Sequence, residues 1–138
     1  MEEVLNKLEE SDNIIVDDDH SWGYQLRMVN EVGTGDGDKG YCGKLMVLTN
    51  TKPGSMHYHE VKRETFVVLS GEVCVVVAHY PELEEEIEDG PWESSHFLYP
   101  GDTLTLDPDT EHRMWAEVVP SVVLEVSTHD EDSDTYRV

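Results

Sequence analysis

Four residues of the chain have side chains and spacing that could bind a metal ion. His57 and His59 are separated by one residue, and Glu64 follows after four more. Alternate side chains of a β-strand point to the same face, so the two imidazoles would lie side by side. His112 opens another apolar strand after the turn-forming segment 107–111, and it could supply a third imidazole.

Three imidazoles and one carboxylate suit a divalent cation of borderline softness. Glu64 begins a predicted strand, and Phe66 and Val68 lie on the same face of that strand as Glu64. An unpaired carboxylate is costly to bury there, and a cation beside it removes that cost. The set leaves one or two coordination positions open for water or substrate, which favours catalysis over structural support. It does not distinguish manganese, zinc, iron, cobalt or nickel.

Strands must position these residues, because short β-branched and aromatic runs separated by turn signals dominate the chain. Residues 1–12 predict a short acidic helix. The predicted strands are 14–16, 41–50, 56–61, 64–70, 73–80, 96–99, 103–106, 112–118 and 121–127, and the predicted loops include 33–40 and the acidic segment 81–95. No linker or repeat interrupts this pattern. It predicts one all-β domain, built as a closed barrel or a sandwich.

The charge balance excludes several classes of partner. The 138 residues include 31 Asp or Glu against 9 Lys or Arg, which gives a formal net charge of −22. Nucleic acids and anionic membrane surfaces are bound by clustered basic residues, so neither is an expected partner. A high-salt cytoplasm or simply a well-solvated surface would account for the acidity.

The apolar segments and the cysteines indicate where the protein works. No apolar run approaches the roughly 20 residues needed to span a bilayer. Residues 1–5 carry no positive charge ahead of an apolar stretch, unlike a secretory signal, so we expect a cytoplasmic protein. Cys42 and Cys74 form no CxxC motif and lie in apolar strand-like segments, which favours buried free thiols.

The whole pattern resembles the two-part signature of the cupin superfamily, from about residue 22 to residue 126. The resemblance rests on the His57-x-His59 pair, Glu64, Gly71, Gly101, Pro108 and His112. Thr110 and Ala116 depart from the usual Gly and Asn, but neither is a ligand. The resemblance implies an all-β, cupin-type small antiparallel β-barrel (a double-stranded β-helix or jelly roll). The barrel would span 22–127, with a short acidic extension at 1–21 and a tail at 128–138.

By the same resemblance, one divalent metal ion would be bound inside the barrel by His57, His59, Glu64 and His112. Shorter segments are similar to a sugar-related branch, which includes the cupin domain of type II mannose-6-phosphate isomerases and the D-lyxose ketol-isomerases. These segments are 22–24, 41–45, 57–66 and 125–129. In the ketol-isomerases a lysine lies between the second histidine and the glutamate, and Lys62 matches it.

This finer resemblance implies an enzyme that isomerises an aldose and a ketose, free or phosphorylated, through an enediol. The metal would polarise the sugar carbonyl, Glu125 would transfer the proton, and Lys62 would stabilise the developing oxyanion. Structural roles compete with both assignments. Lys62 and Arg63 could be a solvated pair at a sheet edge, and Glu125 could face outward against a cation.

Two other functions fit the same ligands: a metal-dependent oxygenase, and a non-catalytic carbohydrate-binding or assembly module with a stabilising metal. We expect a homodimer, because a second copy often covers the outer faces of such small barrels. Arg113 should point away from the metal. The aromatic residues Trp22, Trp115, Phe66 and Tyr58 are expected in the core or at the rim, with Tyr58 and Trp115 as candidates to stack on a sugar. The remaining histidines, His20, His79, His96 and His129, are expected to be surface or hydrogen-bonded residues.

Overall fold

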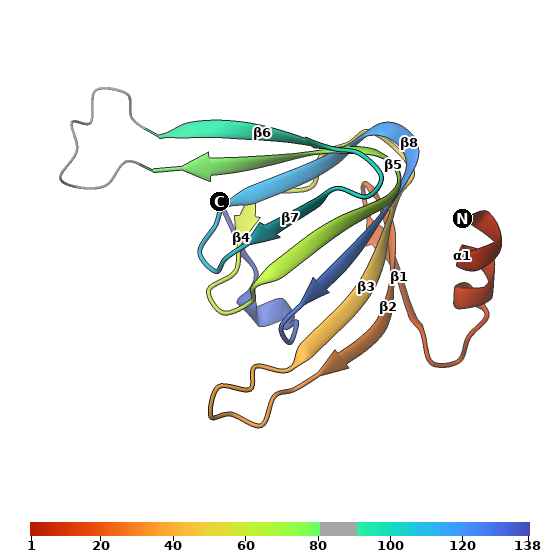
Figure 1. The fold of residues 1–138 in the computed structure, drawn as a ribbon, viewed down its shortest axis with the longest axis horizontal. Coiled ribbons are helices and arrows are strands. Elements are labelled where there is room, and N and C mark those ends of the chain that lie inside the picture. The colour runs from red at the N-terminus through yellow and green to blue at the C-terminus, as the bar shows by residue number, and fades with distance from the viewer. Residues whose placement is uncertain (81–90) are drawn as a thin grey trace.

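The computed structural model describes residues 1–80 and 91–138, which form a short helix and a curled antiparallel sheet (Figure 1). Helix α1 spans Glu2–Glu9, which confirms the predicted acidic helix. Its Leu5 and Leu8 pack beside a small cluster that contains the fully buried Leu26. No helix in the described ranges has the length and apolar character needed to cross a membrane.

Nine strands form the sheet in the described residues. They are β1 (Ile15–His20), β2 (Gly23–Glu31), β3 (Tyr41–Leu48), β4 (His57–Tyr58), β5 (Glu64–His79), β6 (Trp92–Leu98), β7 (Thr103–Leu106), β8 (His112–Ser127) and β9 (Tyr136–Arg137). One path runs β1-β2-β3-β8-β4-β9, and β5 pairs with β6, β7 and β8. Every pairing is antiparallel, so the predicted all-β antiparallel class is confirmed.

The two longest strands differ from the sequence prediction, which divided each of them into two. β5 continues through Gly71, whose φ of 85° accommodates shifts in its register with β8. A side chain at this position would collide with Ser121. The first part of β5 pairs with β7 and the second with β6, so one strand serves two parts of the sheet. Gly71 therefore marks a bulge and not a turn.

Three other boundaries also differ from the prediction. β4 covers only two residues of the predicted strand 56–61, because the chain turns after Tyr58. β1 extends to His20, beyond the predicted strand 14–16, and adds an edge strand to β2. β6 begins at Trp92, inside the predicted loop 81–95, of which 81–90 lie outside the described residues.

The apolar core lies inside the curled sheet and forms the floor beneath the site. Its fully buried members come mainly from β5 and β8, and include Phe66, Val68, Val73, Val75 and Val123. Strand alternation puts Glu64 on the same face as Phe66 and Val68, as the sequence predicted. The second part of β5 lies between β6 and β8, and only its last residues extend beyond β8 beside the start of β6, at the upper left of Figure 1. We call β6 and this part of β5 the β5–β6 ribbon. Cys42 and Cys74 are buried free thiols, as expected.

Candidate metal centre

The four predicted metal ligands come together where three strands begin. His57 opens β4 and is directly paired with His112, the first residue of β8. Glu64 is the first residue of β5, and His59 lies in the turn between β4 and β5. One ligand atom from each histidine lies within 4.8 Å of those of the other two. This is close enough for the three imidazoles to share one ion.

Hydrogen bonds to the backbone fix the orientation of all three imidazole rings. Their Nδ1 atoms donate to the carbonyl oxygens of Ser55 (from His57, 2.8 Å), Asp134 (from His59, 3.0 Å) and Thr110 (from His112, 2.8 Å). A carbonyl oxygen can only accept, so Nδ1 carries the proton and Nε2 of the neutral ring keeps its lone pair. The same arrangement orients histidine ligands at known metal sites.

Glu64 supplies the carboxylate beside these rings. Its Oε1 lies 2.8 Å from Nε2 of His112, and its Oε2 lies 3.8 Å from Nε2 of His59. The close approach of Oε1 lacks hydrogen-bond geometry, so this buried oxygen has no hydrogen-bond partner in the described part of the chain. A buried carboxylate oxygen without a partner is costly, and a cation between it and the imidazoles would satisfy it. The donor set therefore fits a divalent metal ion.

Electrostatics keep most of this set in its metal-binding form. Burial, reinforced by the neighbouring His112, lowers the pKa of His57 to about 4, so this ring is neutral near pH 7. Burial and the ammonium of Lys62 also lower the pKa of His59. Burial alone would raise the pKa of Glu64, but His112 and Lys62 hold it well below its usual range. Burial alone would lower the pKa of His112, but the contact with Glu64 raises it overall.

A buried network of opposite charges adjoins the ligands. Nζ of Lys62 lies 3.0 Å from Oε2 of Glu64, 3.4 Å from Oε2 of Glu125 and 3.1 Å from Oδ1 of Asp130. Nζ of Lys44 lies 3.4 Å from Oε2 of Glu125 and 3.1 Å from Oδ2 of Asp130. Lys62 and Glu125 are each 4% exposed, so neither is the solvated residue that the structural alternative required.

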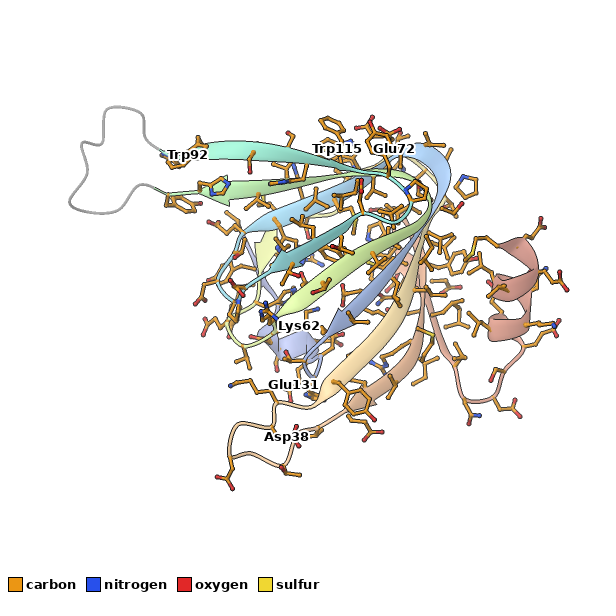
Figure 2. All side chains as sticks on the ribbon, in the orientation of Figure 1. Asp38, Lys62, Glu72, Trp92, Trp115 and Glu131 are labelled. Carbon is orange, nitrogen blue, oxygen red and sulfur yellow. The ribbon has the colours of Figure 1, made fainter. Side chains whose placement is uncertain are left out.

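The turn between His59 and Glu64 owes its shape to a residue far away in the sequence. The carboxylate of Asp134 accepts hydrogen bonds from the backbone N–H groups of Glu60, Val61 and Lys62, at 3.0–3.3 Å. Figure 2 shows Lys62 at the lower end of β5, close to the C-terminal segment that carries the labelled Glu131. Asp134 thus positions both His59, through its carbonyl oxygen, and Lys62, through its carboxylate.

The ligands and the charged network line one cavity of about 420 Å³, which is within the size range of small-molecule sites. The cavity is also lined by Lys44, Asp130, Asp132, Thr135 and Arg137, and by Asp17, His20, Trp22 and Gln25 near the sheet edge. Four of the lining residues are not identified as site residues by the sequence pattern: Asp17, Gln25, Asp130 and Asp132. His20 is hydrogen-bonded as expected, but it faces the cavity.

Other residues considered in the sequence lie outside this cavity. Tyr58 stacks on Tyr136 at 5.2 Å between ring centroids. Trp115 lies on the far side of the sheet from Lys62 in Figure 2, under the guanidinium of Arg113 at 5.8 Å. Neither Tyr58 nor Trp115 therefore reaches a sugar bound among the described lining residues. Arg113 does not line the cavity and its guanidinium lies over Trp115, so it points away from the candidate ligands, as expected.

Solved structures with the same fold come from several kinds of protein. The capsular polysaccharide assembling protein CapF of Staphylococcus aureus aligns with a TM-score of 0.67 and 11% identity, over 91% of this chain and 34% of its own. A variant oxalate decarboxylase of Bacillus subtilis aligns with a TM-score of 0.69 and 16% identity, over 91% of this chain and 30% of its own. An L-ribose isomerase of Cellulomonas parahominis, solved with L-psicose, aligns with a TM-score of 0.64 and 21% identity, over 82% of this chain and 68% of its own.

These likenesses confirm the cupin barrel, and at such identities they show the fold alone. The chain spans about a third of the length of the first two proteins. No curated protein sequence matches it. The sequence does match the D-lyxose isomerase family over residues 24–137, a segment that contains all four predicted ligands, Lys62 and Glu125. The chain therefore belongs to the D-lyxose isomerase family.

Proposed function

We propose that this chain is a metal-dependent sugar isomerase that interconverts an aldose and a ketose through an enediol. The observation that carries the proposal is the position of the Lys62–Glu125 ion pair, in the same cavity as three imidazoles whose Nδ1 atoms all bind backbone carbonyls. Membership of the D-lyxose isomerase family supports the same class of reaction. So does the shared fold of an L-ribose isomerase solved with L-psicose.

His57, His59, Glu64 and His112 are the residues that would hold the ion. A divalent metal there would polarise the carbonyl and the adjacent hydroxyl of the sugar, which makes the proton on C2 more acidic. The backbone carbonyls behind the three imidazoles hold the rings in one orientation. Manganese, iron, cobalt, nickel and zinc all accept nitrogen and oxygen donors of this kind.

Glu125 and Lys62 divide the proton transfer and the charge stabilisation between them. The carboxylate of Glu125 removes the proton from C2 of the aldose and returns it to C1, while the hydroxyl proton passes from O2 to O1 so that the ketose carbonyl forms at C2. Its Oε2 is held 3.4 Å from both Lys62 and Lys44, which fixes its direction in the cavity. The ammonium of Lys62 is buried, so its attraction to the developing negative charge on the sugar oxygen is weakly screened.

Deuterium incorporation tests the proposal directly. The protein is loaded with manganese or zinc and incubated in heavy water with a panel of aldoses, ketoses and their phosphates, and NMR follows deuterium at C1 and C2. We expect exchange into at least one sugar. Glu125→Gln should lower its rate by at least about 100-fold, the usual scale for loss of a general base. Arg63→Gln is the matched control, because Arg63 is exposed and pairs with Asp107.

If no sugar of the panel incorporates deuterium although one equivalent of metal is bound, the isomerase proposal is rejected. The two alternatives from the sequence then give different results. An oxygenase loaded anaerobically with iron would consume oxygen when a substrate is added. A binding module would retain its affinity for carbohydrate in Lys62→Met, whereas an isomerase would lose turnover.

A further inference from the structure

One wall of the cavity lies apart from the metal centre, at the edge strand β1. It is formed by Asp17 and His20 of β1, by Trp22 in the following turn and by Gln25 of β2, and we call these four residues the edge subsite. Asp17, His20 and Trp22 precede residue 24, where the match to the family begins. Asp17 and His20 therefore lie outside both the matched segment and the shorter segments that resemble the sugar-related branch, whereas Trp22 belongs to the segment 22–24 that does.

The polar side chains of the edge subsite are already connected to one another. Oδ2 of Asp17 lies 3.0 Å from Nε2 of His20 and accepts a hydrogen bond of 3.1 Å from Nε2 of Gln25. Its Oδ1 accepts a hydrogen bond from the backbone N–H of Asp19. The side chains of Asp17 and His20 are 44% and 29% exposed, so a ligand can reach them.

Trp22 gives the edge subsite a flat apolar surface. The imidazole of His20 stacks on its indole, with 4.6 Å between ring centroids and 24° between the planes. The indole also packs against the main core cluster. Gly54 lies beside it, because a Cβ built there would be 3.7 Å from Cδ1 of Trp22. These contacts from several sides hold the indole in a fixed position.

An aromatic surface beside a fixed carboxylate and amide is what a hydroxyl-bearing carbon chain requires. The C–H groups of a sugar lie against an aromatic ring, while neighbouring hydroxyls donate to a carboxylate and accept from an amide. The three imidazoles line the same cavity, so one ligand can extend from the metal centre to this wall. Asp17 is negatively charged, and it repels a phosphate group placed beside it.

We propose that the edge subsite binds the distal, hydroxyl-bearing carbons of an unphosphorylated sugar whose carbonyl end lies at the metal centre. This inference rests on the proposed function for the position of the carbonyl end. It assigns to Asp17 and Trp22 the selection of sugar length and the rejection of distal phosphates. His20 and Gln25 position the Asp17 carboxylate.

Equilibrium binding tests this inference without requiring turnover. Ribitol, xylitol and D-arabinitol are titrated calorimetrically into the zinc-loaded protein, and glycerol serves as the short probe that cannot reach both ends of the cavity. We expect at least one pentitol to bind, with Asp17→Asn and Trp22→Phe each weakening it about tenfold, the scale of one charged hydrogen bond. Glycerol binding should be unchanged. Asp18→Asn is the matched control, because Asp18 is exposed on the same strand and does not line the cavity.

A phosphate arm tests the second part of the inference. Wild-type protein should bind D-arabinose at least about tenfold more tightly than D-arabinose 5-phosphate, and Asp17→Asn should narrow this ratio. The inference is overturned if no pentitol binds, if both variants bind pentitols as the wild type does, or if glycerol is weakened equally. It is also overturned if Asp17→Asn leaves the phosphate ratio unchanged. Failure of the isomerase proposal looks different, because pentitol binding would persist while deuterium exchange is absent.

Discussion

Two groups of histidines in this protein differ in the ring nitrogen that is already occupied. In the candidate metal centre, the Nδ1 atoms bind backbone carbonyls, and the Nε2 atom of His112 lies 2.8 Å from the Glu64 carboxylate. On the β5–β6 ribbon, His79 and His96 both contact Oγ of Ser94 through Nε2, at 2.7 and 3.0 Å. Within the described ranges, no third ligand completes that pair. A histidine pair becomes a metal site only where the surrounding groups leave converging lone pairs and add a carboxylate.

The two regions also differ in burial. Glu64 and Lys62 are 2% and 4% exposed, whereas Trp92 at the outer end of the ribbon is 52% exposed. Figure 2 shows Trp92 far from Lys62, beyond the curled part of the sheet. Interactions in the metal centre are therefore weakly screened and costly to break, while those on the ribbon compete with water. The same substitution should have very different effects in the two places.

The largest difference is expected for metal affinity in a matched pair of variants. His112→Gln should weaken zinc or manganese binding by more than about 100-fold, because loss of an outer-sphere partner alone costs about 10- to 100-fold. His96→Gln should leave it unchanged. Calorimetric titration would show one equivalent bound to the wild type and to His96→Gln. Equal weakening in the two variants would contradict the assignment of the metal to the cavity.

Metal removal should change thermal stability through the same residues. An ion present at 100 times its dissociation constant stabilises the folded state by about 2.7 kcal/mol. Chelation should then lower the Tm of the wild type by roughly 5–10 °C, given the size of the domain. His96→Gln should show the same shift in calorimetric scans, and His112→Gln almost none. A full shift in His112→Gln would place the stabilising ion elsewhere.

Asp130 offers a comparison that depends on pH. Burial by itself would raise its pKa, but Lys44 and Lys62 lower it to about 2, against an ordinary 3.8. Its charge therefore contributes stability above pH 3.8, about 2 kcal/mol, and the contribution is lost as the pH falls through 2. The difference in unfolding free energy between wild type and Asp130→Asn should shrink between pH 5 and pH 2. Denaturant titrations measure it, and a constant difference would contradict the ion-pair origin.

The candidate metal ligands could be identified from their spacing in the sequence, but strand alternation explains only part of it. The shared face of Glu64 and Phe66 is a local property of extended chain, whereas β4 ends at Tyr58 and His59 lies in the following turn. The division of β5 was predicted wrongly because Gly71 has the same sequence signal in a bulge as in a turn.

The charged network could not be predicted, because its partners lie far apart in the sequence. Lys44 and Asp130 are separated by 86 residues. Lys62 and Arg63 look alike in the sequence, but the turn held by Asp134 buries Lys62 and leaves the side chain of Arg63 61% exposed. Only the contact with Asp134 in the C-terminal tail, seen in the folded structure, distinguishes Lys62 from Arg63.

Asp134 should therefore have an effect of intermediate size. Asp134→Ala removes the acceptor for three backbone N–H groups, which should cost about 1–2 kcal/mol, as loss of a helix cap does. The backbone carbonyl of Asp134 also holds the ring of His59, and loosening the turn should displace this contact. Zinc affinity should therefore fall about tenfold. Asp134→Asn keeps one acceptor oxygen, so it should restore part of the stability and part of the zinc affinity. Ser133→Ala is the control, and a loss of stability without any change in zinc affinity would limit Asp134 to a structural role.

The smallest effect is expected where the ribbon histidines meet. Ser94→Ala removes the hydroxyl that both His79 and His96 contact, but the site is only partly buried, so water can replace it. The free energy of unfolding should fall by about 0.5 kcal/mol, the scale of a single partly exposed hydrogen bond. Zinc affinity and deuterium exchange should not change. If exchange were lost while zinc affinity and stability were retained, the ribbon would carry part of the reaction, and the contrast with the metal centre would fail.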